Sequence, residues 1–140
     1  MDFTLRLATV ADVPAMHRIR LSARENRLSD PALVREADYL PFVARGAAFV
    51  AEADGALLGF AAADAPAGSV WALFVAPAAE GRGVGRALER RLLAWARAEG
   101  LKGLTLTTAP GTRAAAFYRA GGWTETGVTA AGELCFARAV

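Results

Sequence analysis

The sequence contains only one cysteine, Cys135, in 140 residues. An internal disulfide bond is therefore impossible, and a metal site built from cysteine thiolates is excluded. No apolar run approaches the roughly eighteen residues that a membrane-spanning helix requires. The first residues, MDFTLRLATV, have neither the positive segment nor the long apolar segment of an export signal. We therefore expect a cytoplasmic protein that binds no metal and does not associate with a membrane.

The sequence also lacks a large excess of charge of either sign. The net charge is only +2, from 16 basic and 14 acidic residues, which gives no reason to expect nucleic acid as a partner. Apolar residues form 54% of the chain, and this composition is inconsistent with disorder. A chain of 140 residues is long enough for one sizeable core. We therefore expect a single domain over residues 1–140.

The apolar pattern predicts alternating groups of strands and helices. The pair Asp54-Gly55 between two apolar runs predicts a β-hairpin. Pro41 interrupts one helical pattern, so we expect either two short helical pieces or a helix that restarts near Asp38. The expected strands cover residues 3–7, 47–53, 56–64, 71–75, 103–108, 123–127 and 133–139. The expected helices cover residues 9–24, 33–45, 83–99 and 112–120. The order β-α-α-β-β-β-α-β-α-β-β indicates an α/β fold with helices on both faces of a mixed sheet.

The most informative stretch is WALFVAPAAEGRGVGRALERRLLAWARAEG, from Trp71 to Gly100. Residues 71–75 form a short apolar run with aromatic and β-branched members, which predicts a buried strand. Pro77 and its small neighbours end that strand. From Gly83 onward, apolar residues at helical spacing predict an amphipathic helix. Its polar face is expected to carry Arg86, Glu89, Arg90, Arg97 and Glu99.

A strand, a glycine-rich loop and a helix in this order are suited to anion binding. The first turn of a helix has backbone N–H groups without intrahelical partners, and the helix dipole leaves partial positive charge there. Gly81, Gly83 and Gly85 remove the Cβ atoms that would keep a phosphate away from those N–H groups. Arg82 and Arg86 add positive charge at the entrance. The simpler alternative is a turn that only connects the strand to the helix.

Two common phosphate-binding motifs do not fit this loop. A P-loop requires Lys and then Ser or Thr after its last glycine, whereas Arg86 and Ala87 follow Gly85 here. The dinucleotide-binding fingerprint requires glycines at positions one, three and six, and the glycines here do not have that spacing. A different phosphate-containing ligand is therefore indicated.

The segment VAPAAEGRGVGRAL resembles the acyl-CoA loop of the GNAT superfamily of N-acetyltransferases. The family signature is Arg or Gln, any two residues, Gly, any residue, and Gly or Ala. Gly83 and Gly85 match the two small positions, whereas Glu80 stands where the family usually has Arg or Gln. The later segment TRAAAFYRAGGW is similar to a second family pattern of Ala, Tyr, Gly and an aromatic residue. Its matching residues are Ala114, Tyr118, Gly122 and Trp123.

The resemblance implies the GNAT fold, a mixed and mostly antiparallel twisted sheet of about seven strands. It also implies that the strands at 71–75 and 103–108 splay apart. The pantetheine arm of acetyl-CoA is expected to enter between them and to pair with the backbone near residues 73–75. The expected cofactor-binding residues are Phe74, Val75, Gly81, Arg82, Gly83, Val84, Gly85, Arg86, Thr108 and Phe117.

Tyr118 matches the family tyrosine that is placed to protonate the sulfur of CoA, so we expect it to be catalytic; packing in the core is the alternative. Many members of the family that the sequence resembles carry a Glu on the strand before the loop. Residues 71–73 of this strand contain no carboxylate, so no general base is evident. The weak candidates for the base are Glu25, Glu52, Asp64 and Glu133. Trp71 is expected either to line the acceptor pocket or to pack against the sheet. A row of arginines that includes Arg20 is expected to be a solvated surface or a guide for an acidic substrate.

The function that the resemblance implies is transfer of an acetyl group from acetyl-CoA to a primary amine, by direct attack in a ternary complex. The short loops favour a small-molecule amine. A peptide or protein N-acetyltransferase is a second hypothesis, and an acyl-CoA-binding module without turnover is a third. A homodimer is left open, and neither nucleic acid nor a membrane is expected as a partner.

Overall fold

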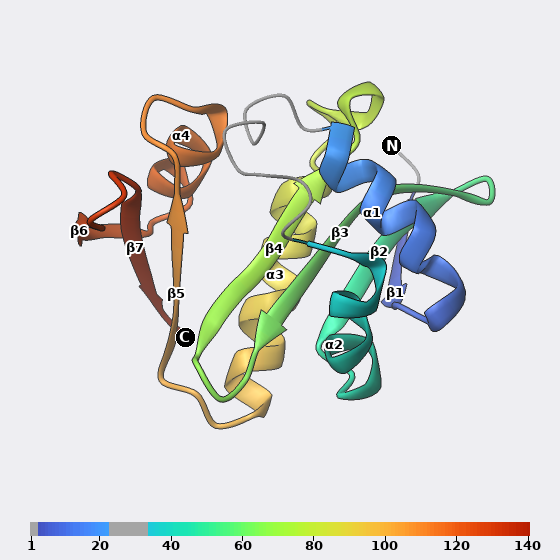
Figure 1. The fold of residues 1–140 in the computed structure, drawn as a ribbon, viewed down its shortest axis with the longest axis horizontal. Coiled ribbons are helices and arrows are strands. Elements are labelled where there is room, and N and C mark those ends of the chain that lie inside the picture. Colours follow the sequence, from blue (N-terminus) through green and yellow to red (C-terminus); the bar gives the residue numbers. More distant parts are fainter. Residues whose placement is uncertain (1–2, 23–33) are drawn as a thin grey trace.

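The computed structural model describes residues 3–22 and 34–140. Its strands form one seven-stranded sheet in the order β1-β2-β3-β4-β5-β7-β6, with helices on both faces (Figure 1). The strands are β1 (Thr4–Leu7), β2 (Ala48–Ala53), β3 (Ala56–Asp64), β4 (Ser69–Val75), β5 (Gly103–Thr108), β6 (Thr124–Val128) and β7 (Leu134–Ala139). The α-helices are α1 (Val13–Ser22), α2 (Leu40–Ala44), α3 (Val84–Ala98) and α4 (Arg113–Ala120). Short 3₁₀ turns are η1 (Val10–Asp12), η4 (Glu36–Tyr39) and η5 (Pro77–Ala79).

The β2–β3 hairpin forms at the predicted position. Asp54 and Gly55 connect the strands with φ angles of 52° and 78°, which suits the tight two-residue turns of hairpins. The divided helix is also confirmed. Pro41 lies in the first turn of α2, where its missing N–H costs nothing, and η4 precedes it as a separate piece. Residues 23–33, with the expected end of the first helix, lie outside the described residues.

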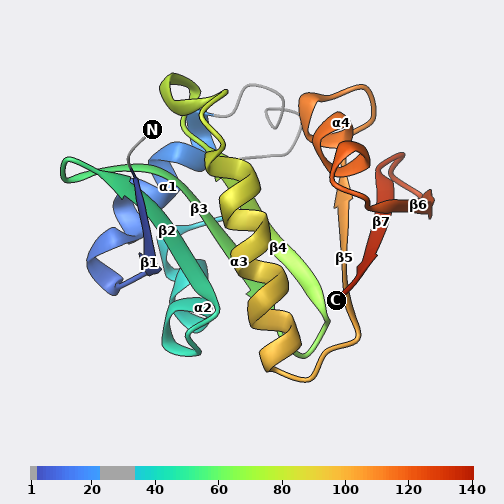
Figure 2. The same cartoon turned by 180° about the vertical axis from the view of Figure 1, so that it is seen from behind.

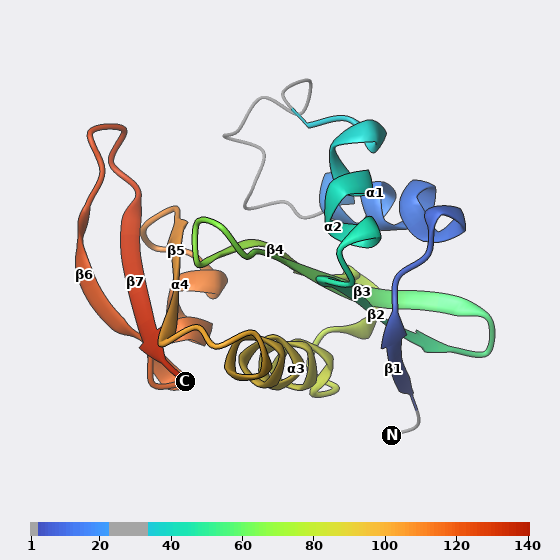
Figure 3. The ribbon, with the colours of Figure 1, turned by 90° about the horizontal axis from the view of Figure 1, so that it is seen from below.

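β4 and β5 are parallel, but only Ser69 and Thr105 pair between them. Beyond this point the two strands diverge toward their carboxyl ends (Figure 1). β5 instead pairs with β7 along its whole length, so β5, β7 and β6 turn away from the rest of the sheet, as Figure 3 shows. The predicted splay is therefore confirmed, and it leaves the second half of β4 without a strand partner on one side.

The two faces of the sheet carry separate cores. α3 lies across one face (Figure 2), where Leu88 and Leu92 are buried with sheet residues such as Phe49. On the other face, α1 and η4 bury Met16 and Tyr39 against the sheet. Residues 61–63 at the centre are alanines that are almost fully buried. Their small side chains let helices pack closely on both sides.

Candidate active site

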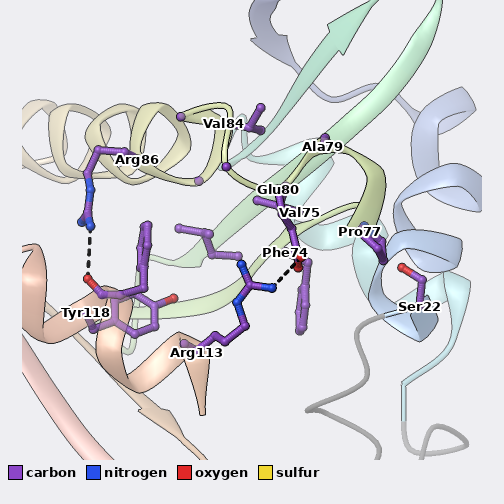
Figure 4. A pocket seen from close by; sticks show the side chains of 16 residues that line it. Ser22, Phe74, Val75, Pro77, Ala79, Glu80, Val84, Arg86, Arg113 and Tyr118 are labelled. Atoms are coloured by element: carbon purple, nitrogen blue, oxygen red, sulfur yellow. Dashed lines mark hydrogen bonds and ion pairs between the residues drawn. The ribbon is translucent and has the colours of Figure 1, made fainter.

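A cavity of about 680 Å³ opens at the carboxyl end of β4. It lies between β4, the β4–α3 loop, the first turn of α3 and helix α4, and Ser22 at the end of α1 also reaches it. Figure 4 shows Tyr118 and Phe74 on opposite sides of this cavity, with Arg113 and Glu80 between them. The splay of β4 from β5 thus creates the space that the sequence motifs predicted.

The glycine loop supplies the cavity with free backbone N–H groups. Gly81 and Gly83 adopt φ angles of 80° and 82°, a left-handed conformation that glycine adopts without the steric penalty of a Cβ atom. No atom lies within 4 Å of a Cβ built on either glycine. The N–H of Ala87 donates to the carbonyl of Gly83 at 3.0 Å, so the preceding N–H groups of α3 point outward at the helix end. This is the geometry that binds phosphates.

Gly85 is explained by a close contact, whereas Gly81 and Gly83 are explained by their backbone conformation. A Cβ built on Gly85 lies 3.3 Å from Cε1 of Phe117 and 3.5 Å from Cγ2 of Val75. Gly85 therefore lets the first turn of α3 pack closely against α4 and β4. The small residue at this position is explained by packing as well as by ligand access.

Arg86 contacts two groups of the protein within the cavity wall. Its Nη1 donates to Oε1 of Glu89 at 2.7 Å, and its Nη2 donates to the carbonyl of Phe117 at 3.2 Å. The guanidinium carbon lies 4.0 Å from the centre of the Phe117 ring. Arg86 therefore lines the cavity, but part of its charge is already compensated.

Glu89 is 3% exposed, so its predicted place on the polar face of the helix is wrong. Besides Arg86, the indole N–H of Trp123 donates to Glu89 Oε2 at 2.6 Å. A Cβ on Gly121 would lie 2.2 Å from Nη1 of Arg86 and 2.7 Å from Oε2 of Glu89. The α4 end of the chain thus covers this side of α3, and a larger residue at Gly121 would displace the ends of the Arg86 and Glu89 side chains. Helical periodicity alone gives no signal for that cover.

Tyr118 lines the cavity from α4 and is 6% exposed. Burial raises the pKa of its phenol, and the negative charge of Glu89 raises it further. Among the described residues, no hydrogen bond is found at its hydroxyl, and none contributes to the shift of its pKa. The ring packs edge-on against Phe117 and Trp123. The ring therefore packs in the core while the residue also borders the cavity, and the catalytic role of Tyr118 stays a prediction.

An ion pair spans the cavity between the loop and α4. Nη1 of Arg113 donates to Oε1 of Glu80 at 2.6 Å, and both side chains are exposed (Figure 4). Glu80 stands where the signature of the family that the sequence resembles has Arg or Gln. Arg113 offsets the negative charge that Glu80 brings to the loop.

All but two of the predicted site residues line the cavity. The exceptions are Arg82, whose side chain is exposed, and Thr108, which pairs with Leu134 in the β5–β7 ladder. The cavity is also lined by residues outside the predicted set: Ser22, Leu73, Pro77, Ala79, Glu80, Arg113 and Ala114. The packing of α1 brings Ser22 there, and the local sequence carries no signal for that contact.

The candidate bases are spread over the molecule. Glu52 is tied to Arg6 at 2.8 Å, which lowers the pKa of its carboxyl group. Asp64 pairs with Ser69, roughly 13 Å along β4 from Leu73, the nearest residue of that strand that lines the cavity. Glu133 precedes Leu134, which pairs with the last residue of β5, so it lies at the cavity end of the sheet. Glu25 lies outside the described residues.

Neither a metal site nor a membrane span is found in the described residues. Within 3–22 and 34–140, no group of three His, Cys, Asp or Glu side chains could hold a metal ion. The helices of the same ranges are too short or too polar to cross a bilayer.

Comparison with known proteins identifies the family. The model of the acetyltransferase (GNAT) family matches residues 13–122, so the chain belongs to this family. No curated protein sequence matches it significantly. The fold is similar to that of Ard1 from Thermoplasma volcanium, with a TM-score of 0.86 and 18% identity over 100% of this chain and 99% of that one.

Two further solved structures share the fold. The ribosomal-protein-S18-alanine N-acetyltransferase of Escherichia coli has a TM-score of 0.77 and 21% identity, over 99% of this chain and 94% of that one. The PaiA N-acetyltransferase of Thermoplasma acidophilum, solved in complex with coenzyme A, has a TM-score of 0.80 and 14% identity over 100% of both chains. The predicted family and fold class are confirmed by these matches.

Proposed function

We propose that this protein transfers an acetyl group from acetyl-CoA to a primary amine of a small molecule, as a single-domain enzyme that binds both substrates at once. One observation carries the proposal: the open N-terminus of α3 and Tyr118 border the same cavity. The helix N-terminus is suited to holding a diphosphate. The hydroxyl of Tyr118 is suited to donating a proton to a leaving group.

The residues of the cavity fit acetyl-CoA. The N–H groups that precede Ala87 would hold the diphosphate, and the open space at Gly81 and Gly83 leaves room for its oxygens. Residues 73–75 of β4 pair with β3 on one edge only. Their other backbone groups are free to pair with the amides of the pantetheine arm. When bound, acetyl-CoA supplies an activated thioester carbonyl.

The transfer exchanges one bond for another. A bond forms between the amine nitrogen and the acetyl carbon, the bond from that carbon to sulfur breaks, the amine loses a proton and the thiolate gains one. Tyr118 is protonated at neutral pH, because the ordinary pKa of tyrosine is about 10 and burial raises it further. Its proton is therefore available where the thiolate develops. A hydrogen bond donated by Tyr118 would stabilise that charge.

The acceptor must lose a proton before it attacks. An amine with a pKa of about 10.4 costs roughly 4–5 kcal/mol to deprotonate at pH 7. β4 carries no carboxylate at residues 71–73 for this purpose. Water in the cavity, or Glu133 at the same end of the sheet, would have to take the proton.

Two alternatives have some support. The E. coli structure with the same fold is an acetyltransferase of a ribosomal protein, so a peptide or protein acceptor is the second candidate. The missing carboxylate on β4 favours the third candidate, a module that binds acyl-CoA without turnover.

Release of free thiol from acetyl-CoA in the presence of a panel of amines tests all three. Acceleration by small amines supports the proposal, and acceleration only by peptides supports the second candidate. Binding of acetyl-CoA measured by calorimetry, with no acceleration by any amine or peptide, would leave the binding module.

A further inference from the structure

We infer that the acceptor is an amino carboxylic acid, and that Arg20 of α1 binds its carboxylate; this inference rests on the function proposed above. Arg20 lies on the opposite face of β4 from α3, in a cluster of aromatic side chains. Its guanidinium carbon is 4.8 Å from the ring centre of Trp71 and 5.0 Å from that of Phe74.

This cluster is next to the cavity. Phe74 lines the cavity, and so does Ser22, two residues after Arg20 on the same helix. An acceptor that entered from the α1 side, between the diverging β4 and β5, would meet the guanidinium before it reached the thioester. Trp71 thus borders the expected path of the acceptor and also packs against Phe42 and Tyr39.

The surroundings of Arg20 leave it without an anionic partner among the described residues. Nη1 is shielded from solvent and makes no hydrogen bond there, and none of the ion pairs in residues 3–22 and 34–140 includes Arg20. Two aromatic rings attract the cation but accept no directed hydrogen bond. A buried charged donor without an acceptor is costly, and a carboxylate is the ligand whose geometry matches a guanidinium.

The neighbours of Arg20 do not replace that carboxylate. The hydroxyl of Tyr39 lies 2.9 Å from Nδ1 of His17 and is held by it. Burial raises the pKa of Tyr39, and the positive charge of Arg20 and a hydrogen bond from its side chain oppose that rise. This neutral phenol is therefore an acceptor for Arg20 that carries no charge to offset the guanidinium, and Nη1 is still left without a partner. Glu36 and Asp38 also act on Tyr39. Neither of them is ion-paired with Arg20.

The same charge helps the reaction that we propose. A guanidinium beside the acceptor disfavours the ammonium form of its amine, and this lowers the amine pKa toward neutrality. The carboxylate of an amino acid would be held at Arg20 while its neutral amine faced the acetyl group. β4 lacks a basic carboxylate, and Arg20 reduces the need for one.

Pairs of acceptors that differ only at the carboxylate test the inference on the native protein. Amino acids are compared with their amides in the thiol-release assay across a range of pH values. We expect kcat/KM to be higher for the acids by about ten- to a hundredfold. At a given pH, a larger fraction of the amine is neutral in the amides than in the acids. This difference by itself would make the amides react faster, so it cannot produce a preference for the acids.

Substitution of Arg20 separates recognition from folding. In Arg20→Gln we expect KM for the amino acid to rise about ten- to a hundredfold, with kcat/KM for the amide and KM for acetyl-CoA little changed. Arg20→Lys should lie between the two because it keeps the charge but loses the planar fork. Arg18→Gln, an exposed arginine on the same helix, is the matched control and should leave both acceptors unaffected.

The outcomes distinguish this inference from the proposed function. If amides are acetylated as well as acids, or Arg20→Gln weakens both alike, the carboxylate site is wrong and the acetyltransferase stands. If Arg20→Gln does not fold, the acid–amide comparison on the native protein decides the inference. If no amine of either kind accelerates thiol release, the proposed function fails and the inference fails with it.

Discussion

The indole N–H of Trp123 donates to Oε2 of the buried carboxylate of Glu89 at 2.6 Å. The other oxygen of that carboxylate accepts from Arg86 at 2.7 Å. Trp123 follows α4, whereas Glu89 and Arg86 belong to α3, so the carboxylate fixes the C-terminal segment to the helix that begins at the glycine loop. The wall of the cavity that carries Tyr118 is held to the wall formed by the start of α3 by this carboxylate.

Glu89→Ala should therefore destabilise the protein strongly. Removing the carboxylate leaves the buried indole N–H of Trp123 without its acceptor and takes one of two acceptors from the part-buried guanidinium of Arg86, which we expect to lower the free energy of unfolding by about 2–3 kcal/mol. Chemical denaturation measures the change. Arg90→Ala, at an exposed position of the same helix, should stay within about 0.5 kcal/mol. A loss below about 1 kcal/mol in Glu89→Ala would contradict the role given to this network.

Gly83→Ala should weaken acetyl-CoA binding more than it weakens the fold. The left-handed φ of 82° makes alanine cost about 1–2 kcal/mol of stability, and the new methyl group obstructs the approach to the free N–H groups. We expect KM for acetyl-CoA to rise about five- to thirtyfold. Gly46→Ala is the control, because φ is 68° and no atom lies within 4 Å of the added Cβ. It should cost similar stability and leave KM unchanged; equal effects on KM would count against phosphate binding at the loop.

The Glu80–Arg113 ion pair should affect acetyl-CoA binding through charge alone. Arg113→Gln leaves the Glu80 carboxylate beside the expected phosphate position, so we expect affinity to fall about two- to fivefold at low salt, and less at high salt. Glu80→Gln should raise the affinity, and the double variant should return it near its starting value. Calorimetry measures these changes. Arg119→Gln breaks the exposed Arg119–Glu125 pair outside the cavity and should have no effect on affinity.

Local signals in the sequence predicted the helices and strands, and most of the residues they indicated for cofactor binding line one cavity. Asp54-Gly55 required a tight turn, and Gly81 and Gly83 required an open loop, because these conformations depend on the residues themselves. Glu89 could not be predicted as buried, since its environment comes from Trp123, 34 positions later in the chain. The position of Arg20 against an aromatic ring likewise could not be predicted, since it depends on Trp71, which lies about fifty residues later in the chain on β4. The surroundings of these two side chains are set by contacts between distant elements, and helical periodicity carries no information about such contacts.

Acid should destabilise the protein through Asp12. Arg6 donates to both carboxylate oxygens of Asp12 at 2.7 and 2.9 Å, and these bonds lower the pKa of Asp12 to about 2. The unfolded chain binds this proton at higher pH than the native protein, so the stabilisation is complete above pH 4–5 and is lost as the pH falls toward 2. We expect this loss to be about 2 kcal/mol in the free energy of unfolding.

Asp12→Asn checks that assignment. The variant should be less stable at neutral pH, and its stability should vary less with pH between about 5 and 2. Denaturation curves at a series of pH values measure both. Arg6 also binds Glu52 and lowers the pKa of its carboxyl group, so the stability of the variant should still depend weakly on pH in the same range. An unchanged acid profile in the variant would assign the loss to other carboxylates.

Tyr118→Phe should lower kcat by at least about a hundredfold, because general acid catalysis contributes about that much or more. Since no hydrogen bond is found at the hydroxyl among the described residues, its removal leaves the packing of the ring intact, and KM for acetyl-CoA should change little. Single-turnover acetylation separates this loss from binding. The raised pKa of Tyr118 adds a second test: the native enzyme should gain activity as the acceptor amine deprotonates and should not lose its acid near the usual tyrosine pKa of about 10. Unchanged turnover in Tyr118→Phe would restrict this tyrosine to packing, and a different donor would then have to protonate the thiolate.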